Sequence, residues 1–582
     1  MTYVLLIPRC TNNDVFIGYW ADHWTYTLDL VNSFTSIFPD KEEEMLWDSA
    51  KIPFFMSPAV VKPRSSRYVL IEDPERPKKH TIRIFNAICA WGDEDFPTSK
   101  YNALTKIYKD SNYVASADGT AGVWQQNSLG NTFEVSPVTK LCMLALIKFS
   151  TMDPHGMGVE MEGGKPGWND AMNGLPGIIG SGMSETYELL LIVRYVRRVS
   201  EQYNRGISFP HEFSDFLDGL SKALDKFAAT NGDVDDEFVF WDTSNDLRET
   251  YREETIAVFE GTMIEWSVKH MIALLNKVES KVKFGIDRAL HVNGGLSPTF
   301  FYYECVDYVV SENSTSGLKI VTPKKFVLQT LPLFLEGPMR YMKTVDDVEL
   351  KRKVYENTKA SDIYDQKLQM FKISGSLTGM RQEIGRMMAF SSGWLENESV
   401  WLHMSYKFYL ELLRGKLYDA FYNEIRTGLV PFMDPKVYGR SPLEAASFIV
   451  SSVFPDKKLH GASFLARLSG STAEFLSMWE LITQGPSPFV LNDDGELILS
   501  LQPAVASWLF HNDGTICFKF LGVVTVIYHN PLFQDTWNMR PVRYEIVKVD
   551  GSEHSVEGMV IGPELAVATR NLQVQSIDVY FE

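Results

Sequence analysis

Long stretches of this sequence repeat apolar residues every three or four positions, and this spacing most strongly limits the folds that it can adopt. The pattern occurs at 24–38, 136–150 and 184–203, and again at 400–425 and 470–483. Such spacing puts the apolar side chains on one face of a helix, which must then be buried. Loops rich in Gly, Asn, Asp and Pro separate the first three stretches. Helices joined by long polar loops predict a helical toroid whose loops build a site at one end.

Two other regions are dominated by β-branched and aromatic residues. Residues 299–310 and 318–335 are typical of strands, and short strands and turns prevail from about 490 onward. A chain of 582 residues is too long for one small core, so we expect several domains. The predicted boundaries are 1–230 for the first helical part, 231–385 for an insertion, 386–490 for the last helical part and 491–582 for a C-terminal antiparallel β domain.

Composition excludes some partners. The formal charge of −18 argues against nucleic acid and anionic membrane, because both need a basic surface. No run of about 18 apolar residues exists, so no membrane span is predicted. The aromatic content of 13% is typical of proteins that stack rings on sugars, and equally of a large aromatic core.

Cysteine usage predicts a reducing compartment. The five cysteines are scattered without a C-x-x-C pair, which argues against disulfides and structural zinc. No His, Cys and carboxylate cluster shows ligand spacing, so no metal is expected. The N-terminal MTYVLLIPRC is too short in apolar residues for a secretion signal, and we therefore expect a cytoplasmic protein. The cysteines are Cys10, Cys89, Cys142, Cys305 and Cys517.

A glycine-rich stretch at 163–189 interrupts the helical sequence around a single carboxylate, Asp170. Its seven glycines allow the backbone to turn sharply and to approach a ligand closely. Trp168 offers a ring face for stacking, and Asp170 is a candidate general acid if its surroundings favour the protonated form. A helix-connecting loop with a capping Asp would show the same pattern, and the residues alone leave both interpretations open.

The sequence WNDAMNG at 168–174 resembles the GDWNDGMN motif of the inverting disaccharide phosphorylases of glycoside hydrolase family 94. The longer form GGKPGWNDAMNGLPG is more similar to the related families 149 and 161, the β-1,3-glucan phosphorylases. In that motif the Asp protonates the glycosidic oxygen and the Trp packs at the sugar site. The resemblance implies these roles for Asp170 and Trp168. It also implies a mainly α fold, namely an (α/α)6 barrel with an α+β insertion and a C-terminal antiparallel β-sandwich domain.

Further matches to these families follow in order and span most of residues 1–490. GYWADHWTYTLDL at 18–30 resembles a segment whose Asp holds sugar hydroxyls, and GWLENESVWLHM at 393–404 resembles a loop containing Glu-Asn. VYGRSPLEAASFIVSS at 437–452 resembles a substrate-site segment that includes Arg440. The implied substrate-binding residues are Trp168, Asn169, Asp22, His23, Trp24, Lys165, Glu396, Asn397 and Glu444.

FLARLSGSTAEF at 464–475 resembles the loop with which family 94 binds phosphate. Hydroxyl groups and a glycine amide suit an anion, and the helix predicted to follow would add the positive end of its dipole. An ordinary Ser-capped helix would look the same. The implied phosphate-binding residues are Arg9, Arg467, Ser469, Gly470 and Ser471.

This chain departs from the family 94 pattern at two positions, because Ala466 and Ala21 stand where that family has His and Arg. His403 and His460 are candidates to supply the missing positive charge. The chain also begins almost at the first barrel motif, so the resemblance implies that the N-terminal β-sandwich domain of the family is lacking. We therefore expect a homodimer or a separate partner for that missing domain.

The resemblance implies inverting phosphorolysis of a β-glucan or β-gluco-oligosaccharide, with β-1,3 linkage favoured, to α-glucose 1-phosphate. Inorganic phosphate is the co-substrate and no cofactor is expected. Phosphate brings its own negative charge, so one carboxylate suffices, whereas an inverting hydrolase needs a second one about 6.5–9.5 Å away. Two alternatives stay open: an inverting hydrolase that uses Glu396 or Glu444 as its base, and an inactive truncated paralogue that binds glucan.

Overall fold

The computed structural model describes residues 26–49, 51–56, 59–85, 87–90, 123–162, 166–256, 258–311, 317–466 and 470–582. The described part of the chain is about 44% helical with 24% strand, so it mixes helices with sheets. It divides into two compact units, each of which collects segments from distant parts of the sequence. Unit 1 comprises Met1–Thr27, Leu46–Thr344 and Ser374–Ser391, and unit 2 comprises Leu28–Met45, Val345–Ile373 and Ser392–Glu582.

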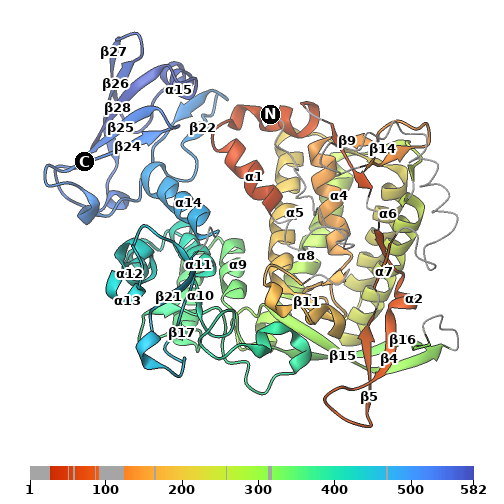
Figure 1. The fold of residues 1–582 in the computed structure, drawn as a ribbon. Coiled ribbons are helices and arrows are strands. Elements are labelled where there is room, and N and C mark those ends of the chain that lie inside the picture. Colours follow the sequence, from red (N-terminus) through yellow and green to blue (C-terminus); the bar gives the residue numbers. More distant parts are fainter. Residues whose placement is uncertain are drawn as a thin grey trace. The chain divides into compact units, whose positions relative to one another are not determined.

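Long helices that lie side by side form one part of unit 1 (Figure 1). Their starts follow capping rules: Ser136 accepts a hydrogen bond from the backbone N–H of Thr139, and Asp233 forms a capping box with Asp236. Among the described residues, no helix has both the length and the apolar character needed to cross a bilayer. The long helices are α4 (Pro137–Phe149), α5 (Met183–Tyr203), α6 (His211–Ala228), α7 (Val234–Thr255) and α8 (Val268–Val292), of which α4 and α5 were predicted at 136–150 and 184–203.

A six-stranded antiparallel sheet forms the other part of unit 1. Its longest strands confirm the strands predicted within 299–335. Aromatic side chains of the first half of β15 are buried, whereas its second half is mostly exposed. The order of the sheet is β10 (Val159–Glu160), β11 (Gly180–Gly182), β15 (Phe300–Ser311), β16 (Lys319–Thr330), β4 (Tyr68–Glu72) and β5 (His80–Ile84).

The two units divide the chain differently from the predicted boundaries at 230/231 and 385/386. Helices α7 and α8 pack against α6 and α5 of the preceding segment, and β15 and β16 pair with β11 and β4. Residues 231–344 therefore share a core with residues before 230. Local periodicity could not reveal this sharing, because strand pairing joins residues far apart in the sequence.

Unit 2 contains a second group of helices with a small sheet. Helix α11 (Leu402–Arg414) packs against α12 (Tyr418–Gly428) and α14 (Ser471–Gln484), which confirms the helical sequence predicted at 400–425 and 470–483. The predicted helix at 400–425 is broken at Gly415, which caps the end of α11. The small sheet has the order β19 (Val400–Trp401), β20 (Ala446–Ile449) and β21 (Ser463–Ala466).

The C-terminal strands form one mixed five-stranded sheet, and the predicted antiparallel β-sandwich was wrong in this respect. Strand β28 lies between β25 and β26 and runs parallel to β25. The chain reaches it through α15 (Pro563–Arg570), and a helical crossover is the connection that allows a parallel pair. The order is β24 (Thr515–Phe520), β25 (Val524–His529), β28 (Val574–Phe581), β26 (Pro541–Lys548) and β27 (Glu553–Glu557).

Candidate functional site

The glycine-rich stretch of unit 1 folds into two short 3₁₀ turns, η5 (Asp170–Met172) and η6 (Leu175–Ile178), followed by β11 and α5. Asp170 is the first residue of η5, and 46% of its side chain is exposed. Trp168 is partly buried two residues earlier. The predicted acid and the predicted stacking ring therefore lie in one loop, with the carboxylate accessible to solvent.

Asn169 caps this loop. Its side-chain oxygen accepts a hydrogen bond from the backbone N–H of Ala171 at 3.1 Å, and the residue is 2% exposed. A buried capping side chain sets the direction of the backbone at the next residue, Asp170. The structure thus gives Asn169 a positioning role, in addition to the sugar-binding role that the resemblance implies.

An apolar core fixes the inner face of the loop. Ala171, Met172 and Leu175 are completely buried, and they share one cluster with Ile384 and Met387 of a distant segment. Those two residues belong to the 3₁₀ turns η7 (Gln382–Ile384) and η8 (Arg386–Ala389). The Asp170 loop is therefore packed against residues more than 200 positions later in the sequence.

Backbone contacts lock these two segments together. The N–H of Gly174 donates to the carbonyl of Ile384 at 2.9 Å, and the N–H of Arg386 donates to the side-chain oxygen of Asn173 at 2.9 Å. A Cβ atom at Gly174 would lie only 1.8 Å from the carbonyl oxygen of Glu383, so this approach requires glycine. We call residues 381–387 the clamp segment.

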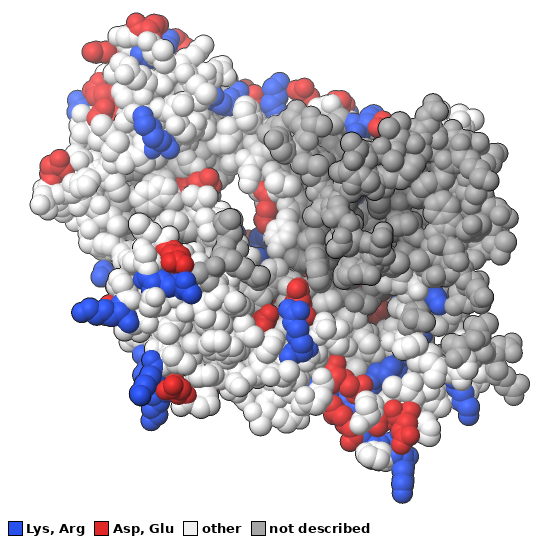
Figure 2. Space-filling view, viewed as in Figure 1, with Lys and Arg blue, Asp and Glu red and all other residues white. Residues whose placement is uncertain are grey.

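Charged pairs hold the clamp segment from behind. The Arg83 guanidinium donates to both carboxylate oxygens of Glu383, at 2.7 and 2.8 Å, and Arg381 pairs with Asp73 at 2.8 Å. Burial disfavours the charge of Glu383, but the guanidinium groups of Arg83 and Arg381 outweigh it and hold the pKa of that carboxyl below its ordinary value. Figure 2 shows acidic and basic side chains mingled in the lower right of the view, where β4 and β5 lie in Figure 1.

Sequence analysis missed the clamp segment and its Arg386, whose Nη2 lies 3.8 Å from Asp170 Oδ2. Nothing near Asp170 in the sequence points to residue 386. The only sequence signal was local. In RQEIGRMM at 381–388, the apolar residues Ile384 and Met387 stand among charged residues, a pattern that indicates a segment with one buried face, and both are buried in the structure.

In unit 2, the start of α14 lies against a histidine. A Cβ atom at Gly470 would come within 2.0 Å of His403 Cε1, so the loop backbone rests on the imidazole ring. His403 Nε2 lies 3.5 Å from Glu474 Oε1, and Lys407 Nζ lies 4.0 Å from the same oxygen. Ser471, the first residue of α14, is 1% exposed.

These contacts place the Glu474 carboxylate together with two basic side chains at the start of α14. Burial disfavours the charge of Glu474, yet His403, Lys407 and Arg414 outweigh it and lower the pKa of the carboxyl. A helix N-terminus flanked by an imidazole and an ammonium attracts anions. The structure thus brings His403 to the predicted phosphate loop, where Ala466 lacks a charge.

The other predicted residues of unit 2 that the structure describes contact other parts of the protein. Glu396 and Asn397 are 9% and 7% exposed in the turn before β19. Glu444 is exposed and pairs with Arg440 at 2.8 Å. His460 contacts Lys367 Nζ at 2.7 Å and the carbonyl of Phe454 at 2.7 Å.

Seven predicted residues fall outside the described residues. Within the described ranges, no group of three or more His, Cys, Asp or Glu side chains could hold a metal ion. The seven residues are Arg9, Asp22, His23, Trp24, Lys165, Arg467 and Ser469.

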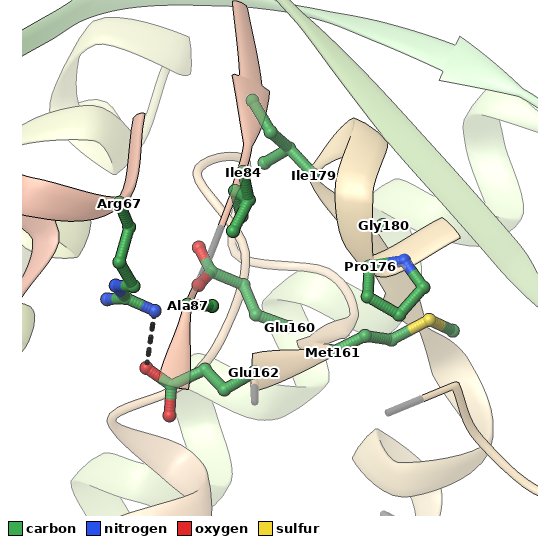
Figure 3. A pocket seen from close by; sticks show the side chains of 9 residues that line it. All are labelled: Arg67, Ile84, Ala87, Glu160, Met161, Glu162, Pro176, Ile179 and Gly180. Carbon is green, nitrogen blue, oxygen red and sulfur yellow. Dashed lines mark hydrogen bonds and ion pairs between the residues drawn. The ribbon is translucent and has the colours of Figure 1, made fainter. Parts of the chain in front are cut away.

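A buried charge cluster supports the other end of the glycine-rich stretch (Figure 3). Glu160 and Glu162 line a small pocket with Arg67 and with Pro176 and Gly180 of that stretch. Glu162 pairs with three guanidinium groups, from Arg248 at 3.0 Å, Arg252 at 2.7 Å and Arg67 at 3.4 Å.

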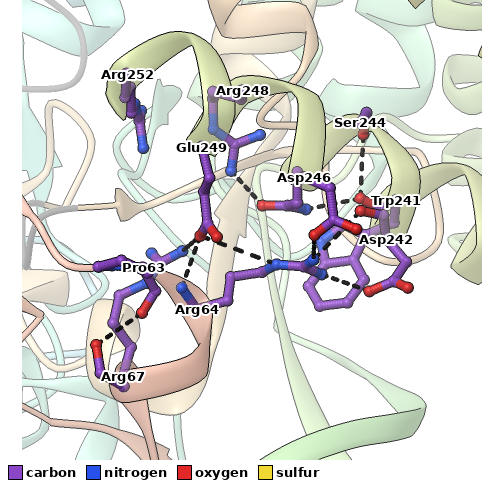
Figure 4. Close-up of polar contacts among 12 residues, drawn as sticks. Pro63, Arg64, Arg67, Trp241, Asp242, Ser244, Asp246, Arg248, Glu249 and Arg252 are labelled. Carbon is purple, nitrogen blue, oxygen red and sulfur yellow. Dashed lines mark hydrogen bonds and ion pairs between the residues drawn. The ribbon is translucent and has the colours of Figure 1, made fainter. Parts of the chain in front are cut away.

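Arg64 adds an outer layer to this cluster (Figure 4). It pairs with Asp242 at 2.7 Å and Asp246 at 2.5 Å, and its guanidinium carbon lies 4.8 Å from the centre of the Trp241 ring. The indole N–H of Trp241 in turn donates to Glu160 at 2.5 Å. Arg67, Arg248 and Arg252 therefore compensate the buried charge of Glu162, as buried charges require.

Comparison of the sequence with known protein families and with characterised proteins gives no significant match.

Proposed function

We propose that the protein catalyses inverting phosphorolysis of a β-linked gluco-oligosaccharide, with β-1,3 linkage favoured, on an (α/α)6 barrel. Asp170 donates its proton to the glycosidic oxygen as the bond from C1 to that oxygen breaks. An oxygen of inorganic phosphate attacks C1 from the opposite face and forms α-glucose 1-phosphate. The products are this sugar phosphate and an oligosaccharide shortened by one glucose unit.

The observation that carries this proposal is that Asp170 combines a fixed backbone with a solvent-accessible carboxylate. Its loop is held by an apolar core and by two hydrogen bonds to the clamp segment, while its carboxylate stays half exposed, two residues after Trp168. A general acid needs such a fixed backbone, because its proton must be delivered to one oxygen of a bound substrate. A purely structural capping Asp would be consumed by local hydrogen bonds, whereas here Asn169 does the capping.

Phosphate needs a cationic cradle and no base, because it is already an anion at neutral pH. The resemblance assigns this role to the start of α14, where His403 and Lys407 lie near Gly470, Ser471 and the Glu474 carboxylate. The resemblance adds Arg9, Arg467 and Ser469 as further phosphate ligands.

The test is to incubate laminari-oligosaccharides and cello-oligosaccharides with the protein, with and without inorganic phosphate. We expect α-glucose 1-phosphate to form only when phosphate is present. Release of free glucose in phosphate-free buffer would identify a hydrolase instead. Oligosaccharide binding without turnover in either buffer would identify a glucan-binding protein, and either result would contradict phosphorolysis.

Replacing Gly470 by alanine should impair phosphate binding. The new Cβ would overlap the His403 ring, so the loop or the imidazole must move, and a shift of about 1 Å at a catalytic site can cost up to about 10²-fold in rate. We expect KM for phosphate to rise at least about tenfold, measured by initial rates at saturating oligosaccharide. Gly562→Ala is the matched control, because a Cβ there meets no atom within 4 Å. Equal KM values in both variants would exclude Gly470 from the phosphate site.

A further inference from the structure

A second charged side chain stands beside the proposed acid. Arg386 Nη2 lies 3.8 Å from Asp170 Oδ2, and the two side chains are 49% and 46% exposed. The pair joins η5 and η8, which are separated by more than 200 residues in the sequence. Solvent and ligands can therefore reach both charged groups.

The fold builds this juxtaposition, since both backbones are fixed. Ala171 and Met172 of η5, and Ile384 and Met387 flanking Arg386, point into one apolar cluster. The hydrogen bond from the N–H of Arg386 to Asn173 sets the start of η8. With the apolar residues directed inward, Asp170 and Arg386 are left on the outer side of the same core.

The clamp segment is also braced on its far side. Glu383, three residues before Arg386, accepts hydrogen bonds from Nε and Nη2 of the Arg83 guanidinium. Arg381 is held by Asp73, whose carboxylate also accepts a hydrogen bond from Arg76 at 2.6 Å. A surface ion pair such as Arg386–Asp170 contributes less than about 1 kcal/mol to the stability of the fold. Stability alone therefore does not explain why the backbone that carries this half-exposed arginine is held by so many contacts.

The chemistry of the acid indicates which part of the substrate Arg386 can contact. The proton of Asp170 goes to the glycosidic oxygen, which leaves with the departing sugar. A group within 4 Å of the carboxylate therefore lies close to that oxygen and within reach of the leaving sugar. Phosphate must enter from the opposite face because the reaction inverts C1. A guanidinium in that position can donate hydrogen bonds to the hydroxyls of the leaving sugar.

We propose that Arg386 is the residue that binds the leaving sugar next to the scissile bond, and hence the acceptor sugar in the reverse reaction. This inference rests on the proposed phosphorolysis. It gives Arg386 a role in acceptor specificity and none in phosphate binding. A hydrogen bond from a charged donor contributes about 1.5–3 kcal/mol, which corresponds to a 10- to 100-fold change in affinity.

The test is a comparison of Arg386→Met with the wild type in the synthetic direction. We expect KM for the acceptor, glucose or laminaribiose, to rise 10-fold or more, while KM for α-glucose 1-phosphate changes less than twofold. Arg386→Lys keeps a donor and should recover part of the loss. Arg543→Met is the matched control, because Arg543 also forms a half-exposed pair with a carboxylate, Glu545, at 3.2 Å in the C-terminal sheet. An unchanged acceptor KM, or an equal rise in both KM values, would overturn the assignment.

Calorimetric titration of laminaribiose onto the wild type and Arg386→Met separates this inference from the reaction itself. Weaker binding to the variant supports the subsite even if no turnover is found, and equal binding overturns it. Absence of phosphate-dependent turnover in the wild type would instead count against the proposed function. Circular dichroism of each variant, compared with the wild type, shows whether the fold is retained.

Discussion

Replacing Asp170 by asparagine should reduce kcat for phosphorolysis by about 10²–10⁴-fold, because an amide cannot deliver the proton that the leaving oxygen needs. The substitution keeps the shape of the side chain. It removes one half-exposed ion pair with Arg386, which contributes less than about 1 kcal/mol. Folding should therefore be preserved, and KM for the oligosaccharide should change little. Initial rates of α-glucose 1-phosphate release, measured alongside thermal unfolding, check both expectations.

An aryl β-glucoside with a good leaving group distinguishes an acid from a structural residue. Such a substrate needs little protonation, so Asp170→Asn should slow its phosphorolysis far less than that of an oligosaccharide. Equal losses on both substrates would mean that residue 170 only shapes the loop. Full activity on the oligosaccharide would exclude Asp170 as the acid.

The second large effect concerns stability, at the buried carboxyl of Glu160. Burial, reinforced by the charge of Glu162, raises the pKa of Glu160 from 4.5 to about 7. The folded state thus binds a proton more tightly than the unfolded chain does. The resulting stabilisation is fully present below pH 4.5 and is lost as the pH rises to about 7.

Glu160→Gln should remove this pH dependence. Glutamine is neutral at every pH and still accepts the hydrogen bond from Trp241. Above pH 7 the variant should be more stable than the wild type by about 3 kcal/mol, since 1.36 kcal/mol corresponds to each pKa unit. Near pH 4 the two proteins should unfold at similar temperatures. Thermal unfolding between pH 4 and pH 8 measures the difference.

Glu162→Gln is the matched comparison in the same cluster. Burial disfavours the charge of Glu162, but Arg248, Arg252 and Arg67 hold its pKa well below the ordinary value. Its removal should therefore destabilise the protein at neutral pH, opposite to Glu160→Gln. Parallel pH curves for the wild type and Glu160→Gln would show that Glu160 titrates normally.

Local patterns in the sequence were enough to find several of the helices and strands. The three- and four-residue spacing at 136–150 and 184–203 corresponds to α4 and α5, and the aromatic run after residue 299 is β15. The arrangement of the strands was beyond the reach of such patterns. The parallel pair β25–β28 depends on a crossover through α15, and the six-stranded sheet pairs β16 with a strand some 250 residues earlier, β4.

The candidate site shows the same limit. The glycines, Trp168 and Asp170 stand together in the sequence, and the loop that they predict is present. Asn169 could have been predicted as a cap, because asparagine favours that position before a helical turn. Arg386 and His403 are brought to their loops by tertiary packing alone, so spacing along the chain could not assign them.

The interleaved segments of the two units have a consequence for synthesis on the ribosome. The Asp170 loop gains its clamp partner, Arg386, only after a further 213 residues beyond Asn173 have been made. Bringing the two ends of so long a chain segment together is entropically costly and slow. Until that contact forms, the side chains of Met172 and Leu175 lack their packing partners Ile384 and Met387. The nascent chain therefore exposes this patch during elongation, when chaperones would have the greatest effect on yield.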